Sequence, residues 1–119
     1  MGRIAKADPN FIAVEPDQAR ERVVNMLRHG VQFCVEIDPT MRGMKDVVVI
    51  SRTAKVVERE GFTLLRQRAV GLNEACHFAM NCIREELTYQ CTPEMRPNDA
   101  DAVEYLFLVE LRSDGRKGA

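Results

Sequence analysis

The apolar positions of this chain fall into short blocks whose spacing changes along the sequence. Between residues 16 and 29 the apolar side chains recur every three or four residues, which is typical of one face of a helix. Pro16 suits the first turn of a helix, and Gly30 suits its exit. The sequence therefore predicts an amphipathic helix over 16–29. Its buried face is expected to carry Ala19, Val23, Met26 and Leu27.

Residues 31–38 instead alternate apolar with polar or small side chains, which is the period of a strand. Turn-forming residues follow at 39–43, and β-branched residues at 47–50 begin a second strand. The two strands are therefore expected to form a hairpin. An apolar run at 11–14 is too short to assign alone and is compatible with an edge strand in front.

The stretch 51–70 fits two patterns. Apolar residues keep helical spacing from Ile50 to Leu64, but β-branched residues are dense and Gly61 lies in the middle. A glycine inside a helix costs about 1 kcal/mol relative to alanine, which favours two strands around Gly61. The helical alternative would halve the expected sheet, and the sequence leaves it open.

Residues 72–87 give the clearest helical pattern in the chain. A loop is expected after this helix, within residues 88–101, because Pro93, Pro97 and Asn98 are turn-forming residues. Residues 103–111 are dense in large apolar side chains and predict a last strand that is buried on both faces. The buried stripe of the second helix is expected to hold Leu72, Cys76, Ala79, Met80, Ile83 and Leu87.

The expected order of elements is α-β-β-β-α-β, with the edge strand in front. This order predicts an α+β fold, in which two helices pack on one face of an antiparallel sheet of four to five strands. The chain of 119 residues is expected to be a single domain, with flexible tails at 1–10 and 112–119. We find no internal repeat in the sequence.

From residue 11 to residue 88, this order of elements resembles the plan of double-stranded-RNA-binding domains. With the front strand it also resembles ribosome hibernation factors. The resemblance implies a three-stranded meander between two helices, and it implies RNA as a partner. The RNA-binding domains carry a lysine cluster where their second helix begins, and that place here reads Gly71-Leu72-Asn73-Glu74, with no positive charge.

Composition narrows the class of protein further. The longest stretch without a charged residue runs from Ala75 to Ile83, nine residues, whereas a membrane span needs about 20. The first residues lack the apolar run of a signal peptide, so a cytoplasmic location is expected. The four cysteines are then expected as free thiols, and Cys91 in the expected loop is the one that could be reactive.

Charge is nearly balanced overall, at −1, but it is unevenly distributed along the chain. Residues 42–70 hold seven basic and three acidic side chains, whereas residues 71–111 hold two basic and eight acidic. Basic side chains beside a methionine-containing turn at 38–45 are typical of an adaptable protein contact. The expected partner-binding residues are Met41, Arg42, Met44, Lys45, Arg52, Lys55, Arg59, Arg66 and Arg68.

Other chemistries have weaker support. Glu74 and His77 share a helix face, but carboxylate–imidazole metal sites need several helices to converge. The cysteine spacings match no common zinc pattern, and no glycine-rich phosphate loop is present. Neither histidine has a nucleophile at a spacing that suggests a catalytic pair. We therefore expect no catalytic residue, no metal and no cofactor.

The sequence favours a small regulatory or adaptor protein that binds another protein through residues 39–68, and it leads us to expect a homodimer. Two alternatives stay open. One is a nucleic-acid-binding module that uses the basic strands of residues 42–68. The other is a small-molecule binder or an enzyme, with a pocket between helix 72–87 and the last strand.

Overall fold

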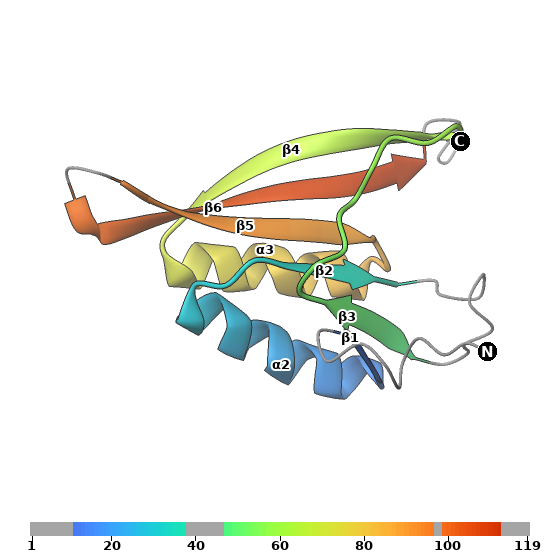
Figure 1. Cartoon of the computed structure of the whole chain (residues 1–119), viewed down its shortest axis with the longest axis horizontal. Helices are drawn as coiled ribbons and strands as arrows, with labels where there is room; N and C mark the ends of the chain where they lie inside the picture. The colour runs from blue at the N-terminus through green and yellow to red at the C-terminus, as the bar shows by residue number, and fades with distance from the viewer. Residues whose placement is uncertain (1–10, 38–46, 97–98, 113–119) are drawn as a thin grey trace.

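The structure, a computed structural model, describes residues 11–37, 47–96 and 99–112. The six strands of this part form one antiparallel sheet in the order β1-β3-β2-β5-β6-β4. Both helices lie on one face of the sheet (Figure 1), which confirms the α+β class with one strand more than expected. The elements are β1 (Phe11–Val14), α2 (Pro16–His29), β2 (Phe33–Glu36), β3 (Val48–Ser51), β4 (Phe62–Val70), α3 (Leu72–Arg84), β5 (Tyr89–Arg96) and β6 (Asp99–Arg112).

Several expectations are confirmed. α2 has the predicted bounds, begins with Pro16 and leaves through Gly30 in the left-handed conformation. β2 and β3 form the predicted hairpin, and β1 lies at one edge of the sheet. α3 ends at Arg84 rather than at residue 87, because Glu86 has a φ of 60° and turns the chain out of the helix.

β5 occupies most of the segment where a loop was expected, so that prediction is wrong. The loop was predicted because proline is a turn-forming residue, and Pro93 lies in the middle of this segment. Thr88 and Glu110 lie at facing positions, and the Glu110 N–H donates to Thr88 O (2.9 Å), so the even-numbered residues of β5 bond to β6. The N–H that Pro93 lacks would therefore point toward β2, whose ladder ends at Cys91. Proline costs no ladder bond at that position.

The three-stranded meander implied by the resemblance to RNA-binding domains is also wrong. β4 does not pair with β3, since it lies at the far edge of the sheet and pairs with β6. Residues 52–61, the crossover segment, connect β3 to β4 across the sheet (Figure 1), and Val56–Val57 do not form a strand. Ser51, the last residue of β3, starts the turn into the crossover segment, because its Oγ accepts the N–H groups of Thr53 (3.1 Å) and Ala54 (2.9 Å).

The chain contains a structural repeat that the sequence did not show. Each half is a strand, a helix and two strands, and its third strand lies between the other two, as β1-β3-β2 and as β4-β6-β5. The halves join where β2 pairs antiparallel with β5 and Cys34 faces Gln90. Equivalent positions are 56 residues apart (90 minus 34): Ala19 and Ala75, Val23 and Ala79, Leu27 and Ile83, Gly30 and Glu86, Phe33 and Tyr89, Val35 and Cys91.

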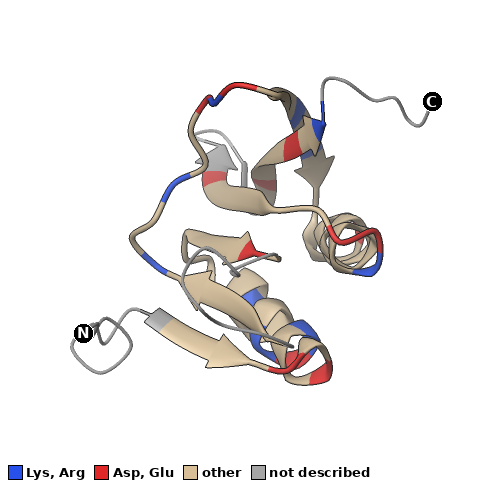
Figure 2. Cartoon of the chain, turned by 90° about the vertical axis from the view of Figure 1, so that its right-hand side faces the viewer, with Lys and Arg blue, Asp and Glu red and all other residues tan. Residues whose placement is uncertain are grey.

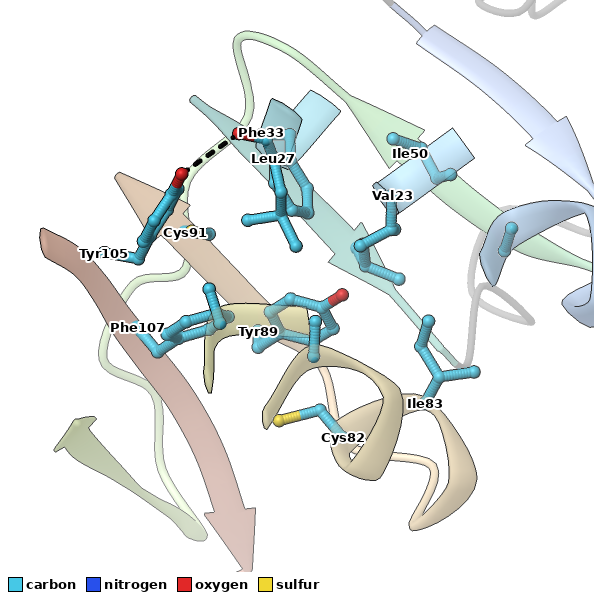
Figure 3. Packing of buried hydrophobic residues seen from close by; sticks show 14 of the residues in the cluster. Val23, Leu27, Phe33, Ile50, Cys82, Ile83, Tyr89, Cys91, Tyr105 and Phe107 are labelled. Atoms are coloured by element: carbon cyan, nitrogen blue, oxygen red, sulfur yellow. Dashed lines mark hydrogen bonds between the residues drawn. The ribbon is translucent and has the colours of Figure 1, made fainter. Parts of the chain in front are cut away.

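The core lies between the helices and the sheet (Figure 3). Tyr89 packs edge-on against Phe33 at 6.1 Å between ring centres, and Phe107 packs against Phe78 at 4.6 Å. The Tyr105 hydroxyl donates to the backbone oxygen of Leu27 (3.2 Å), which ties β6 to the end of α2. Because Tyr89 and Tyr105 belong to the second half and Phe33 and Leu27 to the first, one core serves both halves.

Candidate functional site

The predicted partner-binding residues divide into two groups. Met41, Arg42, Met44 and Lys45 lie outside the described residues. The other five are all exposed, three of them on the crossover segment and two on β4. Figure 2 shows basic residues along the crossover segment on the side of the sheet away from the helices. These five are Arg52, Lys55, Arg59, Arg66 and Arg68.

Two of these basic residues are bound within the chain. Arg59 donates two hydrogen bonds to the carboxylate of Glu110 (2.8 and 2.9 Å) and lies 3.9 Å above the centre of the Phe62 ring. Arg68 donates to Glu104 on β6. Both carboxylates are more than nine-tenths buried, so each needs its guanidinium partner. These two arginines therefore attach the crossover segment and β4 to β6.

The other three basic residues, Arg52, Lys55 and Arg66, form no ion pair with any residue that the structure describes. Their charges can therefore pair with acidic groups of a partner. Arg66 lies at the centre of β4, opposite Leu108 of β6, on the sheet face away from the helices. We call this the outer face.

β4 is the outermost strand on its side of the described sheet (Figure 1), and it is nine residues long. The Gly71 N–H donates to Val103 O (3.0 Å) directly after the last pair of the ladder, Val70 with Glu104. In an antiparallel ladder the bonded positions alternate, so the odd-numbered residues of β4 bond to β6. The N–H and C=O groups of Leu64, Arg66, Arg68 and Val70 therefore point away from the sheet.

Apolar side chains are exposed in the same region. In the described part of the chain the exposed large hydrophobic residues are Val57 (65%), Val70 (48%) and Leu65 (42%). Val57 lies on the crossover segment, and the other two lie on β4. Along β4, Leu65 faces the helix side of the sheet, whereas Arg66 and Val70 face the outer side. A partner at this edge would therefore meet apolar contacts on both faces of the sheet.

We call the free edge of β4, with Leu65, Arg66 and Val70, the β4 edge surface. Sequence reasoning found Arg66, the basic residue of this surface, but missed its two apolar residues. It also missed that β4 is an edge strand. The run Leu64-Leu65-Arg66-Gln67-Arg68 is a usable signal, because two charged residues in a strand of this length are typical of a strand with a free edge.

The crossover segment supports the surface from the outer face. The Val56 N–H donates to Oε1 of Gln90 on β5 (2.9 Å), and Arg59 binds Glu110 on β6. Val56 itself is buried, whereas its neighbour Val57 points into solvent. The segment is thus fixed at two points, Val56 and Arg59; Lys55 directly before the first point and Val57 directly after it are exposed.

The four thiols are buried or half-buried, which agrees with the expectation of free cysteines. Burial raises the pKa of Cys82 to about 12. Burial, with the nearby Cys82, raises the pKa of Cys91 to about 12 as well. Cys91 lies in β5 and not in a loop, and a thiol with such a pKa is a poor nucleophile at neutral pH.

The Tyr89 hydroxyl is fully buried and has no hydrogen-bond partner among the described residues. Burial, followed by the surrounding thiols, raises the pKa of Tyr89 well above its ordinary value. Figure 3 shows its ring among apolar side chains of the sheet and both helices. This orphaned hydroxyl is therefore a cost to stability, and nothing around it supplies a catalytic partner.

The candidate metal ligands do not converge. In the part of the chain that the structure describes, no group of three or more histidine, cysteine, aspartate or glutamate side chains could hold a metal ion. His77 is exposed on α3, whereas Cys82 and Cys91 are buried. Between α3 and β6, the place considered for a ligand pocket, the rings of Phe78 and Phe107 are in contact.

Comparison with known proteins returns no match: no family model, no curated protein and no solved structure is significantly similar to this chain. Among the described residues, no helix is long and apolar enough to cross a membrane.

Proposed function

We propose that this chain is a regulatory or adaptor protein without enzymatic activity, and that it binds another protein through the β4 edge surface. One observation carries the proposal: the exposed large hydrophobic side chains of the described residues all lie on β4 or on the crossover segment that leads into it. Exposed apolar side chains that gather in one region of a surface support an interface there, whereas scattered ones are ordinary.

The free charges support a protein partner more than a nucleic acid. Arg59 and Arg68 are held by buried carboxylates, so Arg52, Lys55 and Arg66 are the described basic residues left for phosphates within 42–68. Three phosphate contacts give a weak salt-dependent affinity, because non-specific affinity rises with the number of phosphates neutralised. Nucleic acid is therefore an outcome of the test below.

The test compares proteins captured from a lysate of the source cells by four forms of the full chain. These are the wild type, Arg66→Glu, Leu65→Asp and the control Arg22→Glu, whose exposed charge lies on α2. A common protein should be captured by the wild type and the control and be reduced by both β4 variants. Capture should also weaken at high salt, most for the wild type.

Equal capture by all four forms would overturn the proposed surface. Strong absorbance at 260 nm in the purified wild type, lost in Arg66→Glu, would replace a protein partner with a nucleic acid. The expected homodimer and the cytoplasmic location belong to the same proposal. A native mass spectrum of the untagged chain tests the dimer, and a tagged chain imaged in its own cells tests the location.

A further inference from the structure

We infer that the β4 edge binds an extended segment of the partner as a seventh strand, and that this segment alternates acidic with apolar side chains. This inference rests on the proposed function and deepens it, because it names the chemistry of the partner.

The backbone of β4 provides the first argument. The outward N–H and C=O groups belong to Leu64, Arg66, Arg68 and Val70. The one described hydrogen bond to them is a long one from the exposed Gln67 side chain to the Arg68 oxygen (3.4 Å), which a partner strand would displace. An edge of this kind is a template for strand addition, in which backbone bonds give affinity and alternate side chains give specificity.

Edge strands are usually protected against such pairing by short length, proline, a bulge or several charges. β1, at the other edge, has four residues. β4 has nine, contains no proline, and its register with β6 is continuous; the irregularity of the sheet lies between β5 and β6 at Met95/Arg96. Since Glu104 binds Arg68, Arg66 is the unpaired charge at the middle of the edge.

The side chains of β4 specify the partner. Directly opposed residues in neighbouring strands share a face, so a partner residue opposite Arg66 would lie on the outer face. A carboxylate there would pair with the guanidinium. The adjacent partner residue would lie opposite Leu65 on the helix face, where a valine or isoleucine would cover that side chain. The partner strand that fits β4 therefore has acidic side chains on its outer face and apolar side chains on its helix face.

A second copy of this chain fits the edge less well. Two β4 strands paired antiparallel about a two-fold axis over their full length would place Arg66 opposite Arg66. If the two-fold axis instead passed through Gln67, each copy would place Arg66 opposite Arg68 of the other copy. Like charges directly opposite each other destabilise a strand pair. The charge of β4 therefore favours a different, acidic segment over self-pairing.

The test uses a designed probe, a fluorescein-labelled nine-residue peptide in which glutamate and valine alternate. Its affinity for the full chain is measured by fluorescence anisotropy. Two control peptides have lysine in place of glutamate or N-methyl groups on alternate amides. The second keeps the side chains but removes the backbone donors along one edge. The glutamate peptide should bind, and both controls should bind at least several-fold more weakly.

Two substitutions at one position separate charge from backbone. Arg66→Gln removes the charge and should weaken binding about 2–5-fold. Arg66→Pro removes the charge and also the outward N–H, which β6 does not use. It should bind the peptide about 2–10-fold more weakly than Arg66→Gln does. Circular dichroism of both variants checks that the sheet is kept, and the N-methylated peptide tests the backbone bonds without changing the protein.

Equal binding of the N-methylated peptide, or equal affinities of Arg66→Pro and Arg66→Gln, would overturn strand addition. Equal binding of the lysine peptide would overturn the acidic partner. The proposed function would survive either result if capture from the lysate still depends on Arg66 and Leu65. It would fail if that capture is unchanged by both substitutions, whatever the designed peptide does.

Discussion

The two halves of this chain share one plan and use it differently. In the first half, β1, β2 and β3 have four residues each, and α2 has a polar surface. In the second half, β4, β5 and β6 have nine, eight and fourteen residues. The equivalent edges therefore differ most: β1 is short, whereas β4 is long and carries exposed apolar and basic side chains.

The halves also differ at equivalent positions in the core and at the helix ends. Phe33 corresponds to Tyr89, Val35 to Cys91, and Gly30 to Glu86, so the second half has a more polar or more strained residue each time. The last turns nevertheless match in detail. Val31 N–H donates to Met26 O in the first half, and Leu87 N–H donates to Cys82 O in the second. Both halves therefore share the turn that ends the helix, while the surface proposed to bind a partner lies on the second half.

The largest expected effect concerns pH. Cys82 and Cys91 are thiols with pKa values near 12 in the folded chain, against about 9 when exposed. The folded state keeps protons that the unfolded state releases, so stability is full below pH 9 and falls above it. Between pH 8 and 10 each thiol should remove about 1 kcal/mol.

This loss can be measured by urea denaturation at pH 8, 9 and 10. Cys91→Val, which copies Val35 of the first half, should reduce the decline by about 1 kcal/mol, and the remainder should come from Cys82 and from the other groups whose pKa burial raises, Cys76, Tyr89 and Tyr105. An unchanged slope in this variant would show that the decline has another source.

The next effect concerns the orphaned hydroxyl. Tyr89→Phe copies Phe33 and removes a buried polar atom that has no described partner, so it should stabilise the chain by roughly 1–2 kcal/mol. The midpoint of chemical denaturation at pH 7 measures this. The matched control is Tyr105→Phe, which loses the hydrogen bond to Leu27 O and should destabilise. A loss of stability in Tyr89→Phe would mean that its hydroxyl has a partner.

The smallest effect concerns the turn after each helix. Glu86 has a φ of 60°, and Gly30 in the same place has a φ of 65°. A residue other than glycine is strained there, so Glu86→Gly should stabilise the chain by about 0.5–1 kcal/mol. The converse change, Gly30→Ala, should destabilise it by a similar amount, although a Cβ at Gly30 meets no atom within 4 Å. Thermal denaturation measures the change in Tm of each variant. Changes of the same sign in the two variants would contradict the equivalence of Gly30 and Glu86.

Local patterns predicted the elements whose signals are local. Pro16 and Gly30 set the bounds of α2, and the alternation around Phe33 and Val35 predicted β2. The pattern failed at β5, because Pro93 is acceptable in a strand only where a neighbouring ladder has ended. It also failed to show the repeat, since few residues are identical at an offset of 56, among them Ala19 and Ala75, and Asn25 and Asn81.

The candidate site was predicted in part. Lys55 and the four described arginines of the predicted set were identified from charge, but the sequence did not show that Arg59 and Arg68 bind buried glutamates of β6. Those glutamates follow the arginines by 51 and 36 residues, so no local spacing could pair them. Leu65 and Val70 were missed because an apolar strand residue is ordinarily buried, and burial depends on which strand lies beside it.

The sequence by itself determined the two helices and the strands with a clear local pattern, such as β2 and β3, because capping residues and side-chain periodicity act over a few residues. It also determined the uneven charge of residues 42–70 and 71–111. Only the tertiary structure decided that β4 crosses to the far edge, that two halves pair through β2 and β5, and which arginines remain unpaired. Those outcomes depend on contacts between residues far apart in the chain, whose stability comes from shared burial rather than from local preference.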